Sequence, residues 1–322
     1  MKNIIGEVVE IHKKYLETFE LGKVVFNNNN FLIIEEYDPY GQYDGYIFEL
    51  KSKNDKIVQK SKYLTFIKSI LEVKKASITF DGIDSIILYA ISHNKLLRID
   101  SFKWKVDKMI KPLKLENDKL YYYVIDYSVK SSKEKCVSIK LISHIEIDSS
   151  ELRSLERFIS NDSNIKELKL LEIYIDDSNM FNVGSVKRND KNFLIIKSYD
   201  PCGEYNGFIY QSKNIITKIN SRTNYLELMK KVIIENESDF DFNDKYSIIE
   251  YAFNNKRLIS ISSNKQKYCY DIKINSFDYK YIDYQIISRL GKLGKERSID
   301  IEKINYINID SLALKSLEKI YK

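Results

Sequence analysis

The strongest constraint on the fold of this chain is a repeat. Residues Phe31–Phe48 read FLIIEEYDPYGQYDGYIF, and residues Phe193–Tyr210 read FLIIKSYDPCGEYNGFIY. Eleven of the eighteen positions are identical, and the two copies align without a gap. A phrase retained at this level predicts that two parts of the chain share one structure.

The spacing that separates Phe31 from Phe193 continues to the end of the chain. The run HIEIDSSELRSLERFI begins at His144, and the run YINIDSLALKSLEKIY begins at Tyr306, which is the same distance along the sequence. A constant spacing leaves no room for insertions between the copies. The sequence therefore predicts two tandem halves of about 160 residues, 1–160 and 161–322, that adopt the same fold.

Each half also shows a weaker internal repeat. The runs KSKYLTFIKSIL, from Lys60, and IDSSELRSLERFI, from Ile147, both read as the end of a strand, a small polar residue and a short amphipathic helix. In the second run, Asp148–Glu151 has the form of a helix N-cap box with Asp in the first place. We therefore predict four units, at residues 1–74, 75–160, 161–236 and 237–322.

Hydrophobic spacing predicts the secondary structure of each unit. Residues 4–20 carry apolar side chains at helical spacing, which predicts a leading helix, and NIKELKLLEIYIDD is its counterpart in the second half. Short β-type runs follow, and in the next unit the predicted helix GIDSIILYAISHN precedes further strands. The predicted fold class is mainly β with short helices, an α+β class in which each unit is a small β-barrel.

The repeated phrase contains two turn signals. The run Asp38–Gly41 has Pro at its second position and Gly at its fourth, which favours a tight turn. Gly45 and Gly207 follow Asp and Asn, and such dipeptides tolerate a positive φ. A hairpin with demanding backbone angles explains every retained residue, and we favour this interpretation.

The alternative interpretation makes this loop the rim of a binding site. Tyr37, Asp38, Tyr43 and Asp44 would then offer rings and carboxylates to a ligand. The counterpart of Asp44 is Asn206, which argues against acid–base catalysis at that position. A binding rim would therefore act through hydrogen bonds and stacking.

Two runs in the second predicted unit resemble the WYL domain, a small Sm-like, SH3-type β-barrel of bacterial transcription regulators and phage-defence-associated proteins. They are IKPLKLENDKLYYYVIDYS, from Ile110, and VSIKLISHIEID, from Val137. Tyr121–Tyr123 stands near the place of the Trp-Tyr-Leu triplet, while Lys140 and His144 take the places of two arginines. The resemblance covers residues 83–160. It implies Sm/SH3-like barrels and a nucleic acid or nucleotide-like ligand.

Composition limits the chemistry that the chain can perform. The net charge of +6 is spread over 98 charged residues, so the chain is compatible with a nucleic-acid partner without requiring one. The three cysteines, Cys136, Cys202 and Cys269, lie far apart, and their spacing matches neither a disulfide framework nor a zinc site. We expect no metal, cofactor or catalytic group, no membrane association, and a location in the reducing cytoplasm.

These features favour a non-enzymatic binding or regulatory protein that senses single-stranded nucleic acid or a nucleotide-like ligand, with a link to phage defence. The alternative is a protein–protein interaction module, such as an inhibitor or immunity factor, and an enzyme is the least favoured class. The predicted ligand-binding residues are Tyr122, Lys140, Lys130, Lys133, Lys135, Tyr43 and Asp38.

Overall fold

The computed structural model describes residues 4–13, 19–52, 55–71, 78–104, 106–125, 133–160, 168–175, 181–234, 240–263 and 269–321. The chain forms two compact units, Met1–Asn161 and Asp162–Lys322. Both are built mainly of β-strands with short helices, and the second repeats the strand order of the first. The predicted fold class and the predicted similarity of the two halves are confirmed at this level.

The first unit contains one ten-stranded sheet. Its strands pair antiparallel in the order β5-β1-β2-β3-β4-β10-β6-β7-β8-β9. The strands are β1 (Val8–His12), β2 (Phe19–Asn27), β3 (Phe31–Tyr37), β4 (Tyr43–Leu50), β5 (Lys56–Val58), β6 (Leu97–Ser101), β7 (Lys108–Glu116), β8 (Lys119–Val124), β9 (Lys135–Ser138) and β10 (Ile142–Ile147).

The second unit contains a ten-stranded sheet with the equivalent order, β15-β11-β12-β13-β14-β20-β16-β17-β18-β19. The pair Ile33–Phe48 of the first sheet corresponds to the pair Ile195–Tyr210 of the second, so the register is also retained. The strands are β11 (Leu170–Tyr174), β12 (Phe181–Asn189), β13 (Phe193–Tyr199), β14 (Tyr205–Ser212), β15 (Lys218–Asn220), β16 (Ile259–Ser263), β17 (Tyr270–Phe277), β18 (Tyr281–Ile287), β19 (Leu293–Asp300) and β20 (Ile304–Ile309).

Each unit carries three α-helices in its described residues. They are α1 (Lys62–Ile70), α2 (Ile83–Ser92) and α3 (Ser150–Ser160) in the first unit, and α4 (Asn224–Val232), α5 (Lys245–Asn254) and α6 (Leu312–Tyr321) in the second. Short 3-10 helices are η1 (Ile139–Leu141), η2 (Lys213–Ile215) and η3 (Ile301–Lys303). In the part of the chain that the structure describes, no helix is both long enough and apolar enough to cross a membrane.

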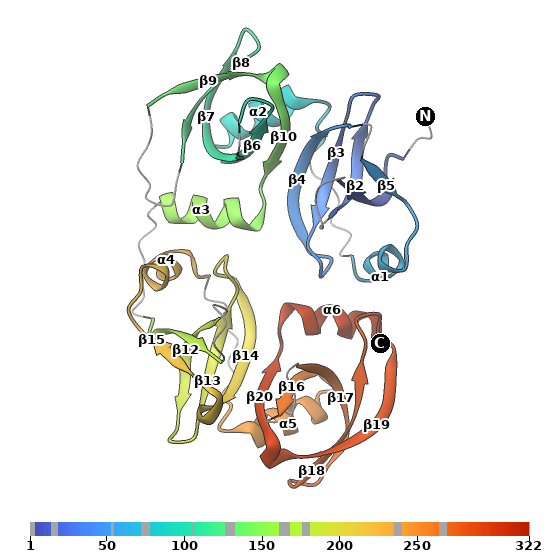
Figure 1. Cartoon of the computed structure of the whole chain (residues 1–322), viewed down its shortest axis with the longest axis vertical. Helices are drawn as coiled ribbons and strands as arrows, with labels where there is room; N and C mark the ends of the chain where they lie inside the picture. The colour runs from blue at the N-terminus through green and yellow to red at the C-terminus, as the bar shows by residue number, and fades with distance from the viewer. Residues whose placement is uncertain are drawn as a thin grey trace. The chain divides into compact units, whose positions relative to one another are not determined.

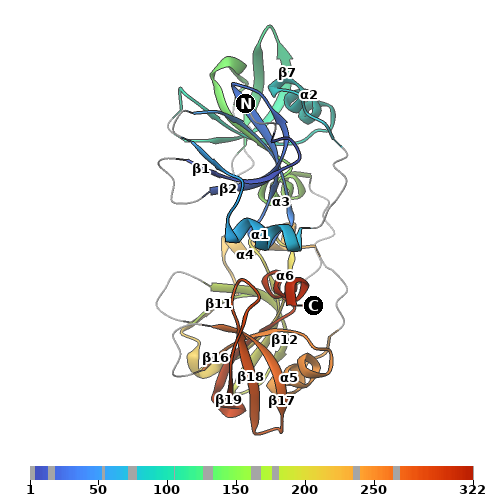
Figure 2. The same cartoon turned by 90° about the vertical axis from the view of Figure 1, so that its right-hand side faces the viewer.

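The main core of the first unit forms where strands β6 to β10 curve around α2 (Figure 1). Ile86, Ile87 and Ala90 lie on one side of α2 and are fully buried. They pack in one cluster with strand residues such as Ile99 and Ile145. The turned view shows α2 against β7 and α5 against β17 (Figure 2). The helix predicted at GIDSIILYAISHN is confirmed, because its apolar residues follow the helical period.

The predicted leading helix is wrong. Within residues 4–20 the structure forms β1, and β2 begins at Phe19, while residues 14–18 lie outside the described residues. The counterpart run contains β11. Val8, Val9 and Ile11 are all buried, because α1 packs against β1 and because Val9 and Ile11 belong to an apolar cluster of the sheet. A strand buried on both faces carries a nearly continuous apolar run, which imitates helical spacing.

The strand β10 joins the two parts of the first sheet that the sequence assigned to separate units. It lies between β4 and β6, and Ile145 faces Phe48 on one side and Ile99 on the other. In the second unit, β20 lies in the same way between β14 and β16. The division of each half at residues 74 and 236, and the closure of its strands into barrels, stay predictions.

The predicted N-cap box before α3 needs a correction. Asp148 has a positive φ of 61° and its side chain pairs with Lys95, so it does not cap the helix. The cap is formed instead by Ser149, whose Oγ accepts a hydrogen bond from Leu152 N at 3.3 Å. A left-handed residue before the helix moves the cap one position along the chain.

Candidate functional site

The first turn signal of the repeated phrase forms the β3–β4 connection. Oδ1 of Asp38 accepts hydrogen bonds from the backbone N–H groups of Tyr40 at 2.9 Å and Gln42 at 2.8 Å. Gly41 N donates to the carbonyl oxygen of Asp38 at 3.0 Å. Asp200 makes the three equivalent contacts in the second unit. The predicted turn is confirmed, and this Oδ1 of Asp38 is committed to the backbone.

The second signal lies at the start of β4 rather than in the loop. Oδ1 of Asp44 accepts a hydrogen bond from Ser150 N at 2.6 Å, at the first residue of α3. In the second unit, Oδ1 of Asn206 accepts from Leu312 N at 3.1 Å, at the first residue of α6. A carboxylate and a side-chain amide can both make this contact, because each has an oxygen that accepts a hydrogen bond from a free backbone N–H at the start of the helix.

The glycine after this residue allows the two segments to approach each other. Gly45 has a φ of 98° and Gly207 a φ of 87°, so the predicted positive φ is confirmed. A Cβ atom on Gly45 would collide with the carbonyl oxygen of Ile147 and lie 2.7 Å from Ser149 N. The phrase therefore recurs because it fastens the β3–β4 hairpin to the start of the last helix of each unit.

The predicted binding residue Tyr43 belongs to the same corner. Its hydroxyl donates to Oδ2 of Asp148 at 3.3 Å, and the ring is half-buried. Burial and the negative charge of Asp148 raise the pKa of Tyr43. The counterpart Tyr205 donates to Asp310 at 2.8 Å. These contacts give Tyr43 and Asp38 structural roles, and a further role in binding stays a prediction.

Two other predicted binding residues, Tyr122 and Lys140, do not meet in the structure. Tyr122 is 2% exposed and packs in the core, with its ring 6.2 Å from that of Trp104. Its alternating position on β8 directs the ring inward, so little of it can stack on a base. Lys140 lies in η1 with its side chain 77% exposed, and pairs with Asp118 at 2.8 Å.

The predicted basic turn can be followed only in part. Lys135 opens β9 and faces Tyr122 across the strand pair, and its side chain is exposed. Lys133 is exposed as well. Lys130 lies outside the described residues. The structure thus places Lys133, Lys135 and Lys140 on the surface, while the predicted aromatic partner Tyr122 is in the core.

A basic cavity that the sequence did not indicate lies at the end of α2. It has a volume of about 420 Å³ and is lined by residues from the connection between α2 and β6, from β7 and from α3. Four of its side chains are cationic and one is a carboxylate, Glu156. The cationic residues of this basic cavity are Lys95, Lys111, Arg153 and Arg157.

The basic cavity has cationic counterparts in the second unit. Each of its four cationic positions is again Lys or Arg at the equivalent place in the second copy, and Glu156 is matched by Glu318. The counterparts are Arg257, Lys273, Lys315 and Lys319. The recurrence of these cationic residues in both copies is the signal in the sequence that could have indicated the cavity. The signal is weak, because lysine is common throughout the chain.

Part of this charge holds the fold together. Lys95 Nζ pairs with Asp148 at 2.9 Å and with Glu156 at 3.2 Å. Burial lowers the pKa of Lys95, but the two carboxylates outweigh burial and raise it overall. Arg257 makes the equivalent pairs in the second unit. Lys111, in contrast, lines the cavity and makes no ion pair with any residue in the described ranges.

A second group of ionisable residues occurs in the first unit, on β2, β3, β4, β6 and β10 and directly after β1. Its members interact through hydrogen bonds, ion pairs or charge. Burial, together with the charges of Glu146, Asp44 and Glu20, raises the pKa of Glu36 to about 9, against the opposing effect of Arg98. We call this group the charged face; it consists of Lys13, Glu20, Glu36, Glu49, Arg98, His144 and Glu146.

Three members of the charged face, Glu20, Glu49 and His144, have ligand atoms within 4.8 Å of one another, as a metal site would require. Lys13 Nζ already lies 2.7 Å from Glu20 Oε1 and 3.0 Å from Glu49 Oε2. His144 Nδ1 lies 2.6 Å from Glu49 Oε2. The ammonium group supplies the positive charge between the carboxylates, and we therefore assign no metal to this cluster.

Comparison of the chain with protein-family models and with curated proteins finds no match.

Proposed function

We propose that the protein is a non-enzymatic binding protein that recognises a phosphate-bearing ligand, a single-stranded nucleic acid or a nucleotide, in the basic cavity. The observation that supports it is the recurrence of four cationic positions, Lys95, Lys111, Arg153 and Arg157, in both units. Lysine and arginine are the side chains that bind phosphate oxygens. A regulatory role and a link to phage defence follow only from the WYL resemblance, and the cytoplasmic location follows from the spacing of the three cysteines.

The proposed ligand, a nucleic acid or a nucleotide, is the one that the sequence suggested. The residues that support it are those of the basic cavity and not Tyr122 and Lys140. Tyr122 is in the core, whereas the cavity combines β7 with α3. We also propose that the strands of each unit close into Sm-like barrels. The WYL resemblance supports this closure, and so does the curvature of the strands around α2 and α5 (Figure 1).

Fluorescence anisotropy with labelled single-stranded RNA and DNA tests the proposal. The wild type should bind at low salt and weaken as salt rises, because bound phosphates release counterions. Competition with ATP and with inorganic phosphate separates a nucleotide or phosphate site from a polymer site. The double variant Lys111→Glu, Lys273→Glu should bind at least about tenfold more weakly while circular dichroism remains unchanged.

The matched control is Lys140→Glu. Lys140 is exposed and lies outside the cavity, and its counterpart is Glu302, so this charge change is already tolerated in the second unit. It should leave binding unchanged. Loss of binding in Lys140→Glu but not in the double variant would move the site to the strands around Lys140. If the wild type binds neither labelled nucleic acid, and calorimetric titration detects no binding of ATP or inorganic phosphate, the proposed function is wrong.

The second candidate is a protein–protein interaction module. Phe102 and Val106 are 71% and 68% exposed, and they flank Trp104 in the connection between β6 and β7. Exposed apolar side chains close together in a loop are typical of a surface for a protein partner. On this alternative the wild type binds a protein partner and no nucleic acid, and the double variant Phe102→Ser, Val106→Ser should lose that partner.

A further inference from the structure

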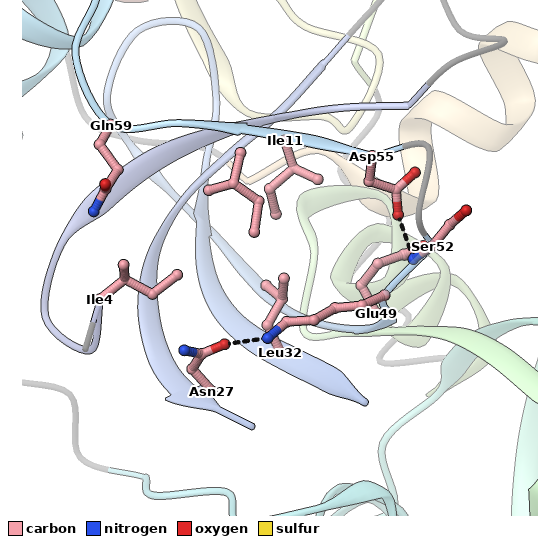
Figure 3. A pocket seen from close by; sticks show the side chains of 10 residues that line it. Ile4, Ile11, Asn27, Leu32, Glu49, Ser52, Asp55 and Gln59 are labelled. Atoms are coloured by element: carbon pink, nitrogen blue, oxygen red, sulfur yellow. Dashed lines mark hydrogen bonds between the residues drawn. The ribbon is translucent and has the colours of Figure 1, made fainter. Parts of the chain in front are cut away.

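The first unit contains another cavity, separate from the basic cavity. It lies among strands β1 to β5 and has a volume of about 280 Å³ (Figure 3). Ile4, Ile11, Leu32 and Ile57 supply apolar walls. The volume is at the lower limit of small-molecule sites, which favours a small metabolite over a polymer. We call it the Glu49 pocket, because Glu49 is its most buried charged residue.

The carboxylates of the pocket have unused acceptor capacity. Glu49 accepts from both Lys13 and His144 through the same oxygen, Oε2. Asp55 accepts from Ser52 N through Oδ2 at 2.9 Å. Among the described residues, neither Oε1 of Glu49 nor Oδ1 of Asp55 has a hydrogen-bond donor. These two oxygens can accept hydrogen bonds from a ligand.

Lys51, the cationic residue that lines the pocket, already has hydrogen-bond acceptors. Lys51 Nζ donates to Oδ1 of Asn27 at 2.5 Å and to the carbonyl oxygen of Asn28. Both partners are neutral, and burial lowers the pKa of Lys51. Because the ammonium group is directed to these acceptors while the carboxylate oxygens are open, the pocket favours a donor ligand over an anion.

The equivalent region of the second unit has a different lining. Ile216 and Tyr306 belong to the apolar cluster around Ile173. Gln211, at the position of Glu49, is fully buried and uncharged. The first unit thus has a carboxylate and a histidine where the second has a neutral amide and a tyrosine, which is the difference expected if the first unit has a ligand of its own.

We propose that the Glu49 pocket binds a small aliphatic amine. The ammonium group donates to Oε1 of Glu49, and the hydrocarbon body packs against Ile11, Leu32 and Ile57. A primary aliphatic amine is protonated at neutral pH, since its pKa is close to that of a lysine side chain, about 10.4. Hydrogen bonds between an ammonium and a carboxylate are stronger than neutral ones. This site does not depend on the basic cavity or on phosphate binding.

Isothermal titration calorimetry on the full chain with three probes of equal shape tests this proposal. Isoamylamine should bind at least about tenfold more tightly than isoamyl alcohol or isovalerate, because only the amine offers a charged donor. Equal binding of isovalerate, or no measurable binding of isoamylamine, overturns the proposal.

Variants locate the site. Glu49→Gln places the second unit's residue in the first and should weaken isoamylamine binding at least about tenfold. Because this variant also removes the partner of His144, Ile57→Trp provides an independent test: it fills the pocket and leaves Glu49 intact. Ile219→Trp, at the matching and 44% exposed position of the second unit, should not change binding. Unchanged binding in folded Ile57→Trp, or in folded Glu49→Gln, overturns the assignment.

Discussion

The two units share a sheet order and differ on the charged face. Every ionisable residue of this face in the first unit is replaced by an uncharged residue in the second. Gln211, which replaces Glu49, is fully buried, and its amide atoms have no hydrogen-bond partner within the described ranges. The seven counterparts are Ile175, Asn182, Ser198, Gln211, Ser260, Tyr306 and Asn308.

The corner that the repeated phrase builds shows the opposite behaviour. Gly45 and Gly207 keep their positive φ, and Asp44 and Asn206 keep one oxygen on the last helix. The comparison separates two kinds of constraint. Glycine is retained in both units because no other residue fits the positive φ and the close approach of the backbone at this corner. The ionisable residues of the charged face are not retained, so they are not needed to form this sheet. They therefore point to a property that only the first unit has.

The largest expected effect comes from the shared corner. Gly45→Val and Gly207→Val should each destabilise their unit by about 3 kcal/mol or more, because a β-branched residue at positive φ is strained and its Cβ meets backbone atoms. Urea unfolding measures the loss. Gly6→Val is the control, since Gly6 has a φ of 86° but no atom within 4 Å of an added Cβ. A corner variant no worse than this control would show that the contact is not limiting.

The next effect transfers a charge from one unit to the other. Ser198 is the counterpart of Glu36, so Ser198→Glu introduces the same carboxylate into the second unit. Ser198 is 4% exposed, and the cation Arg98 is replaced there by Ser260. A buried carboxylate without a cation should cost on the order of 3 kcal/mol at pH 8. Ser198→Gln is the matched neutral control. Equal stability of the two variants at pH 8 would contradict the contrast drawn between the units.

A smaller effect is expected from Glu36→Gln in the first unit. The pKa of Glu36 is raised to about 9, while that of an unfolded Glu is about 4.3. Between these values the folded chain holds a proton that the unfolded chain releases, so wild-type stability falls as pH rises. The variant removes this loss and should gain on the order of 2 kcal/mol relative to wild type at pH 9, and little at pH 4. Urea unfolding at both pH values measures the difference, and a difference independent of pH would contradict it.

The smallest effects concern the helix caps. Asp44→Ala should destabilise the first unit by about 1 kcal/mol, since Ser150 N loses its acceptor. Asp44→Asn should change stability by less than about 0.5 kcal/mol, because Asn206 already serves in the second unit. Thermal unfolding compares them. Equal losses in both variants would mean that the charge of Asp44, and not its hydrogen bond, supports α3.

Local signals in the sequence predicted the parts of the fold that depend on neighbouring residues. The turn at Asp38–Gly41 and helix α2 are set by spacing and turn chemistry, and both were predicted. β1 was missed because burial on both faces hides the period of a strand. The direction of Tyr122 could not be predicted, since alternation gives two faces but does not say which one is the core.

The candidate sites depend on contacts between distant residues. The basic cavity needs the end of α2, Lys111 of β7 and Arg153 of α3, and no local pattern brings these together. The Glu49 pocket combines residues of β1 to β5, and its Glu49 carboxylate contacts His144, from which 95 residues separate it. The constant spacing between the two copies predicted the duplication, but only the folded sheet shows which paired positions face one another.

The central position of β10 affects how the chain is made. β10 lies between β4 and β6 in the sheet. The edges of β4 and β6 that pair with β10 therefore stay without a partner until Ile142–Ile147 has left the ribosome. Pairing over such long sequence distances is slow, and open strand edges invite contact with other nascent chains. A ribosome paused before residue 142 would therefore display an incomplete sheet that is prone to aggregate. Synthesis speed through β10 and α3, and through β20 and α6, becomes a determinant of yield.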